Sequence, residues 1–76
     1  MKKMSRMQVG ERGSVFSMCL EPGLERRLRE LGLGAGAEIC CVGESPFGDP
    51  RAYRISGAVI ALRQCDAAHI IIKGRE

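Results

Sequence analysis

Residues 24–36 read LERRLRELGLGAG, the only stretch of the 76-residue chain with sustained helical periodicity. Its regularly spaced leucines fall at i, i+4 and i+7, which places them on one face of a helix: they are Leu24, Leu28 and Leu31. Gly32 follows the last of them, where a helix that ends in a left-handed residue needs glycine. Leu33 is then placed to fold back onto Leu28 or Leu31, as in a Schellman ending. The pattern predicts a short amphipathic helix laid across one side or end of a small barrel.

The charged residues between these leucines predict a basic outer face for the helix. Such a face can meet an acidic protein surface, although a charged helix face is more often simply solvated. Phe47 lies in a loop with glycine and prolines, where an exposed aromatic side chain can anchor a partner; the alternative is that it folds back over the barrel mouth. The candidate partner-binding residues are Arg26, Arg27, Arg29, Glu30 and Phe47.

Short strands are predicted on both sides of this helix, at residues 14–20, 38–44, 52–55, 59–63 and 70–73. Residues 45–50 form a loop, Ser56 and Gly57 suit a tight hairpin turn, and Asp66 can cap a single helical turn. A parallel sheet would need more helical crossovers than this chain contains. The prediction is therefore a mainly β fold: a small, partly open, five-stranded barrel with one helix between the first two strands and a single turn before the last.

The size and composition of the chain are those of one ordinary globular domain, with 45% apolar and 28% charged residues. Residues 1–8 are expected to be a partly flexible lead, in which Met4 and Met7 can form one turn, and residues 9–76 the barrel domain. The longest apolar runs are far below the ~20 residues of a membrane span, and no secretory signal is recognised. We expect a cytoplasmic location. A net charge of +3 permits an anionic partner without requiring one.

The four cysteines are expected to be reduced thiols, since Cys40 and Cys41 are adjacent and point to opposite faces of a strand. Cys65 and His69 are four residues apart, but one such pair with scattered thiols is a weak match to a zinc site. We therefore predict no metal site and no cofactor. Metal retention that depends on both residues would overturn this prediction.

The residues present give little support for enzymatic activity or for nucleic-acid binding. One histidine and no recognisable nucleophile–base pair argue against an enzyme. Nucleic-acid binding is an open alternative, because small barrels often bind nucleic acid. However, the aromatic residues are only Phe16, Phe47 and Tyr53, and no dense basic run accompanies them.

Several segments together resemble the FeoA family of bacterial ferrous iron transport. They are RLRELGLGAG at 27–36, SPFGDP at 45–50, YRISG at 53–57, ALRQCDAAHI at 61–70, and VGERG at 9–13. These segments occur in the family's order and span almost the whole chain. Cys19, Cys40 and Cys65 depart from the pattern, standing where aliphatic or polar residues are expected.

The resemblance implies an SH3-like barrel and a non-enzymatic cytoplasmic accessory protein that docks on the GTP-binding region of the FeoB membrane transporter and regulates it. It implies recruitment to the inner face of the membrane without insertion. A nucleic-acid-binding protein and an iron- or zinc-binding sensor or chaperone are the alternatives, and a homo-oligomer stays open. The fold is also similar to the C-terminal domain of iron-dependent repressors, but no DNA-reading helix pair is recognised ahead of the barrel in this sequence, so we do not expect such a repressor.

Overall fold

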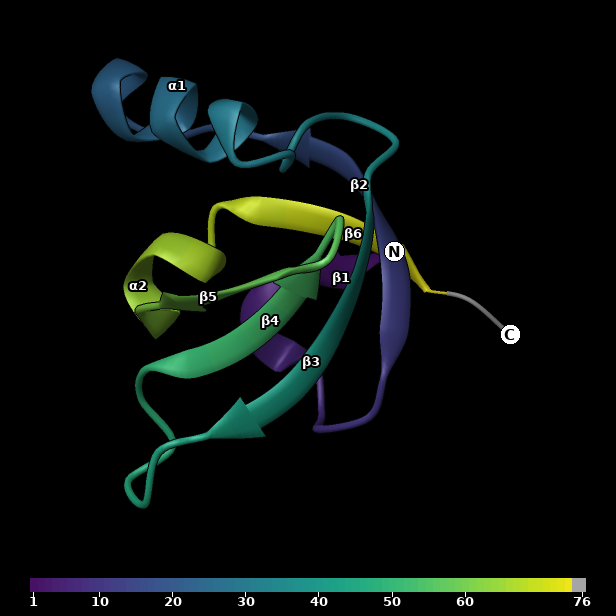
Figure 1. Ribbon diagram of the computed structural model, residues 1–76, viewed down its shortest axis with the longest axis vertical. Coiled ribbons are helices and arrows are strands. Elements are labelled where there is room, and N and C mark those ends of the chain that lie inside the picture. Colours follow the sequence, from purple (N-terminus) through teal and green to yellow (C-terminus); the bar gives the residue numbers. More distant parts are fainter. Residues whose placement is uncertain (75–76) are drawn as a thin grey trace.

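The computed structural model describes residues 1–74 of the chain, which form one antiparallel sheet and three short helical segments (Figure 1). In chain order the elements are β1 (Lys2–Lys3), the 3-10 helix η1 (Met4–Arg6), β2 (Arg12–Met18), α1 (Pro22–Glu30), β3 (Glu38–Glu44), β4 (Arg51–Ile55), β5 (Ala58–Leu62), α2 (Gln64–Ala67) and β6 (Ile70–Gly74). The strands are arranged in the order β1-β6-β2-β3-β4-β5. The predicted mainly β fold is confirmed, with α1 between the first two long strands and α2 before the last strand.

The predicted number of strands is wrong, because the sheet has six strands and not five. The additional strand is β1, in which Lys2 pairs with Ile72 and Lys3 with Ile71. Two lysines show no apolar alternation, so nothing local marks them as a strand. Among residues 1–74 the sheet order ends at β1 and β5, and no strand pair joins these two ends. The barrel is therefore open in its hydrogen bonding.

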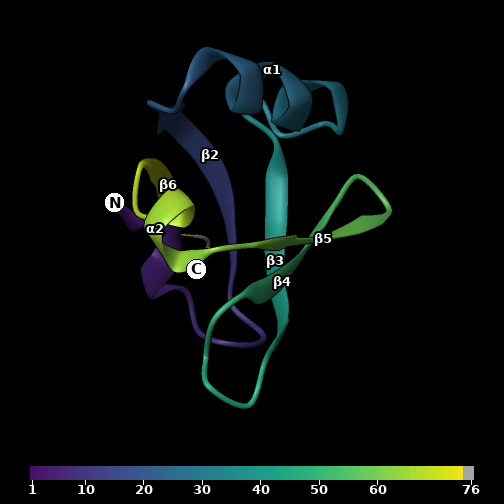
Figure 2. The ribbon, with the colours of Figure 1, turned by 90° about the vertical axis from the view of Figure 1, so that its left-hand side faces the viewer.

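The sheet is bent around one core. A register shift lies between Val15 and Ser17 in β2, and another lies between Cys41 and Gly43 in β3; such bulges increase the local twist and bend of a strand. The core comprises Met4, Met7, Val15, Leu28, Leu33, Ile39, Cys41, Tyr53, Ile55, Leu62, Ala67, Ile70 and Ile72. Figure 2 shows α1 lying across one end of this sheet. Neither α1 nor α2 is long and apolar enough to cross a membrane.

The first residues of the chain pack into the same core. Met4, the first residue of η1, and Met7, which directly follows it, are both fully buried, and η1 is the single turn predicted there. The hydroxyl of Tyr53 donates to the carbonyl oxygen of Met4 over 3.3 Å, and the guanidinium of Arg51 donates to the carbonyl of Met7. The division of the chain into a flexible lead and a separate barrel domain stays a prediction, although the structure places both methionines in the barrel core.

Two turns decide how the second half of the chain is arranged. Ser56 and Gly57 both have positive φ, 49° and 83°, as a two-residue type I′ hairpin turn requires. The turn predicted between β4 and β5 is thus confirmed. The capping of α2 differs from the prediction: Arg63 is the N-cap residue, not Asp66, and the amide of Gln64 donates to the carboxylate of Asp49 over 2.9 Å.

Candidate functional site

Helix α1 is the best-defined surface element that the sequence predicted. Pro22 occupies its first turn, where a missing amide hydrogen costs nothing, and the N-cap Glu21 accepts from the amide of Gly23 over 3.3 Å. Glu25 accepts a hydrogen bond from the amide of Leu20 over 3.3 Å, which ties the helix to the end of β2. The start of α1 is therefore fixed by local contacts, and its outer face has a defined orientation.

The end of α1 is a Schellman motif, as the sequence predicted. The amide of Gly32 donates to Arg29 over 3.0 Å, and the amide of Leu33 donates to Leu28 over 2.8 Å. Leu28 and Leu33 are buried, but Leu31 is 43% exposed, which corrects its expected place in the buried stripe. The chain turns away at Gly32, so Leu33 enters the core and Leu31 stays on the rim.

The outer face of α1 carries the predicted charged residues. Arg26, Arg27, Arg29 and Glu30 are all exposed. Arg29 forms an ion pair of 2.9 Å with Glu25, one turn earlier in the helix. Within residues 1–74, no carboxylate lies within ion-pair distance of Arg26 or Arg27. These two exposed arginines, which are neighbours in the sequence, are thus available to a partner.

Phe47 lies on the loop between β3 and β4, and its side chain is 96% exposed. It does not fold back over the barrel. The loop is held by a hydrogen bond from the amide of Gly48 to Ser45 over 2.8 Å and by one from the side chain of Gln64 to Gly48 over 3.2 Å. This loop and α1 lie at opposite ends of the molecule (Figure 1), so the structure does not bring Phe47 together with the helix arginines.

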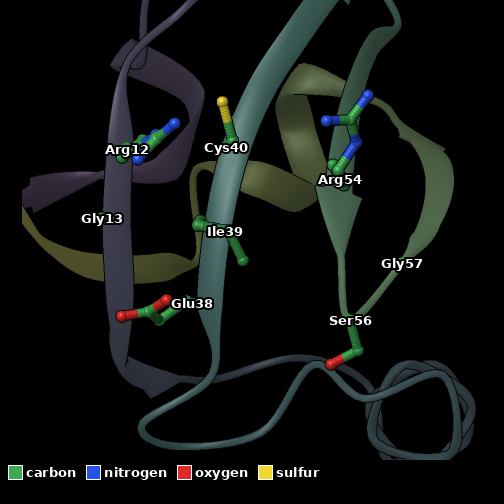
Figure 3. A pocket seen from close by; sticks show the side chains of 8 residues that line it. All are labelled: Arg12, Gly13, Glu38, Ile39, Cys40, Arg54, Ser56 and Gly57. Carbon is green, nitrogen blue, oxygen red and sulfur yellow. The ribbon is translucent and has the colours of Figure 1, made fainter.

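A second candidate site lies on the outer face of the sheet, and none of its residues was among the predicted partner-binding residues. Cys40 of β3 pairs directly with Arg12 of β2 and with Arg54 of β4, so the three side chains lie on one face. Figure 3 shows the thiol of Cys40 between the two arginines. They line a pocket of about 380 Å³, whose other lining residues are Gly13, Glu38, Ile39, Ser56 and Gly57.

The sequence already contained part of the signal for this pocket. Strand alternation places Cys40 on the face opposite Ile39 and Cys41, and it places Arg54 opposite Tyr53 and Ile55. Alternation does not give the register between strands. Only the pairing of three strands shows that the two arginines lie on either side of one thiol.

The four cysteines differ in their exposure. All four are free: Cys19 and Cys65 are exposed, Cys40 is half-buried and Cys41 is buried. Burial raises the pKa of the Cys41 thiol, which keeps it protonated inside the core. In the described part of the chain, no three His, Cys, Asp or Glu side chains are grouped as metal ligands would be.

Comparison with known proteins identifies the relatives of this chain. The family model described as FeoA domain matches residues 2–74. The solution structure of FeoA from Chlorobium tepidum has 34% sequence identity and a TM-score of 0.89, covering 92% of this chain and 67% of that one. The zinc-complexed crystal structure of Stenotrophomonas maltophilia FeoA, an SH3 domain protein, has 26% identity and a TM-score of 0.81, covering 96% of this chain and 91% of that one.

More distant structures share the fold alone. A manganese-dependent transcriptional repressor has 16% identity and a TM-score of 0.84, with 97% of this chain matching 41% of the repressor. No curated protein sequence matches the chain.

Proposed function

The chain belongs to the FeoA family, and on that premise we propose that it is a non-enzymatic accessory protein of bacterial ferrous iron transport. It docks from the cytoplasm on the GTP-binding region of a FeoB-type transporter and regulates that transporter. The family is associated with ferrous iron transport. Docking, regulation and location are the steps proposed here.

The observation that carries this proposal is the basic outer face of α1. Arg26 and Arg27 are exposed and have no carboxylate partner among residues 1–74. Arginine presents a planar fork of donors that fits a carboxylate with two hydrogen bonds. An acidic patch on the transporter's cytoplasmic region therefore suits this face.

An apolar residue adjoins these charges at the end of the same helix. Leu31 is 43% exposed, whereas the neighbouring Leu28 and Leu33 are buried. Protein interfaces commonly combine apolar contacts with arginine and exclude water around them. Leu31 supplies such a contact beside Arg27, and Glu30 at the rim disfavours partners of the wrong charge.

Phe47 serves as a second, separate contact in this proposal. It is exposed on a loop that hydrogen bonds hold in place, so little conformational freedom is lost when it is buried by a partner. Because it lies at the end of the molecule opposite α1, a partner reaches both surfaces only if it wraps around the sheet. Substitutions at α1 and at Phe47 therefore test different contacts.

The proposal is tested by measuring the affinity of this protein for the cytoplasmic domain of its cognate transporter. Reversing both unpaired charges, Arg26→Glu with Arg27→Glu, should weaken binding roughly tenfold or more, because attraction is replaced by repulsion. The matched control is Arg63→Glu with Lys73→Glu, which changes the net charge equally at exposed positions outside α1. The control should bind nearly as well as the unaltered protein.

Equal weakening by both pairs would show that only net charge matters and would contradict docking through α1. Nucleic-acid binding is distinguished in the same assay by a single-stranded oligonucleotide in place of the transporter domain. Binding to the oligonucleotide that falls steeply with added salt, without any binding to the transporter domain, would favour that alternative.

A further inference from the structure

The geometry of the outer-face pocket points to a modification site that is independent of docking through α1. We infer that the pocket takes an anionic low-molecular-weight disulfide of the glutathione type. Its carboxylates contact Arg12 and Arg54, and its sulfur exchanges with Cys40. The inference rests on the strand register, the charge of the pocket and the position of the thiol.

The strand register fixes the position of the reacting Cys40 relative to the two arginines that flank it. Arg12 lies opposite Cys40 on β2, and Arg54 lies opposite Cys40 on β4. Residues directly opposed on neighbouring antiparallel strands have Cβ atoms about 5 Å apart. Each guanidinium is therefore within reach of a group bound over the thiol, which lies between the two arginine side chains in Figure 3.

The charge of the pocket favours an anion at the end where Arg12 and Arg54 flank Cys40. Within residues 1–74, neither Arg12 nor Arg54 has a carboxylate at ion-pair distance. The carboxylate among the lining residues belongs to Glu38, two residues from Cys40 along β3. Figure 3 shows it at the end of the pocket away from Cys40 and the two arginine side chains. A bound molecule with separated carboxylates can thus meet both arginines at a distance from Glu38.

The thiol is accessible and held in position. Cys40 is half-buried and free, whereas Cys41, the next residue, points into the core. Reactive cysteines lie in partly exposed and electropositive surroundings, and buried cysteines are inert. The other accessible thiols differ in context: Cys19 follows the end of β2 and Cys65 lies in α2, so neither stands between cross-strand arginines.

The pocket is large enough for the proposed ligand. Its volume of about 380 Å³ falls within the ~300–1,000 Å³ range of small-molecule sites. Glutathione is a tripeptide with two carboxylates and one thiol, so each half of its disulfide offers two anionic groups to the two arginines. The remaining half stays in solvent and leaves after exchange.

The exchange step conserves atoms and electrons. The thiol of Cys40 gives its proton to solvent, and the resulting thiolate attacks one sulfur of the disulfide. The bond between Cys40 and that sulfur forms as the original sulfur–sulfur bond breaks, and the second glutathione leaves as a thiolate that takes up a proton. Cys40 is oxidised to a mixed disulfide, and one half of the glutathione disulfide is reduced. Excess glutathione reverses the step.

The test compares two disulfides on the folded full-length protein: glutathione disulfide, which is anionic, and cystamine, which is cationic. Mass spectrometry of peptides gives the rate of modification at each cysteine. For each cysteine, the rate with glutathione disulfide is divided by the rate with cystamine. The measured quantity is this ratio at Cys40 relative to the same ratio at Cys19 and at Cys65. A change in the thiolate fraction of Cys40 alters its rate with glutathione disulfide and its rate with cystamine by the same factor. The ratio of these two rates is therefore unaffected by that change.

Cys40 should favour glutathione disulfide over cystamine roughly fivefold more than Cys19 and Cys65 do, at low salt. The double variant Arg12→Gln with Arg54→Gln should lose this preference, and Arg12→Lys with Arg54→Lys should largely keep it. Both variants change exposed side chains on the outer face, and an unchanged thermal unfolding curve confirms that they fold. A preference at Cys40 equal to that at Cys19 and Cys65, or one that survives the glutamine substitutions, would overturn the inference.

Discussion

The backbone amide of Leu33 donates a hydrogen bond to the carbonyl oxygen of Leu28, 2.8 Å away, and both leucine side chains are buried in the core. This bond closes α1 and turns the chain toward β3. It also sets the helix in place across the end of the sheet (Figure 2). The helix arginines Arg26, Arg27 and Arg29 are exposed in this arrangement. The docking surface therefore depends on how the helix ends as much as on its charges.

Gly32→Ala tests this ending. Gly32 has a φ of 102°, and an added Cβ would lie 3.1 Å from the hydroxyl of Ser56. Because L side chains disfavour positive φ, the free energy of unfolding should fall by about 1–2 kcal/mol in a denaturant titration. Gly34→Ala is the matched control, since an added Cβ meets nothing within 4 Å there. A loss for Gly34→Ala as large as that for Gly32→Ala would show that the left-handed conformation at Gly32 does not set the stability of this segment.

Tyr53 should make the protein less stable in alkali. Burial raises its pKa to about 12, so the folded state keeps a phenol proton that the unfolded chain loses near pH 10. Between pH 10 and pH 12 the folded state binds more protons, and its free energy of unfolding falls by about 1 kcal/mol per pH unit from this group.

Spectrophotometric titration checks this value directly, because Tyr53 is the chain's one tyrosine. Its midpoint should lie near pH 12 in the folded protein and move to about 10 in denaturant. Tyr53→Phe should remove this contribution to the pH dependence, and it should cost about 1 kcal/mol at neutral pH through the lost hydrogen bond to Met4. A native midpoint near 10 would mean that the hydroxyl is open to solvent.

Met4→Ala should destabilise the protein by about 2–4 kcal/mol, since it removes a fully buried side chain and leaves a cavity. Met1→Ala is the comparison, at an exposed position three residues earlier, and should have little effect. Thermal or denaturant unfolding measures both. If Met4→Ala proved as mild as Met1→Ala, the first eight residues would be a flexible lead and not part of the core.

Asp49→Ala should cost about 1 kcal/mol, because the carboxylate of Asp49 accepts from the amide of Gln64 at the start of α2. The loop that carries Phe47 should also become more mobile, which hydrogen exchange at Gly48 would detect. Asp66→Ala compares the residue that the sequence indicated as the cap. A larger loss for Asp66→Ala would reverse the assignment made from the structure.

The sequence could predict the elements that carry a periodic pattern. The leucine spacing identified α1, alternation identified β3 at residues 38–44, and Ser56 with Gly57 identified the hairpin turn. Each of these signals is local, because the residues that make it are close in sequence. The basic face of α1 followed from the same periodicity.

Contacts between distant segments could not be predicted in this way. β1 consists of two lysines and exists because β6 is there to pair with it. The carboxylate that accepts from the amide of Gln64, the first residue of α2, belongs to Asp49, fifteen residues earlier along the chain. The pocket requires β2, β3 and β4 in one register, which places Arg12 and Arg54 beside Cys40. Leu31 was expected on the same helix face as Leu24 and Leu28, but the spacing of the leucines does not show how far that face is covered by the sheet.

The most direct test of docking through α1 is an NMR titration of the isotope-labelled protein with the cytoplasmic domain of its cognate transporter. The amide signals of α1 and its ending, from Glu25 to Leu33, should shift or broaden most, and the Arg26→Glu, Arg27→Glu protein should show much smaller changes at the same concentrations. Changes confined to the sheet or to the Phe47 loop, with α1 unaffected, would contradict the account.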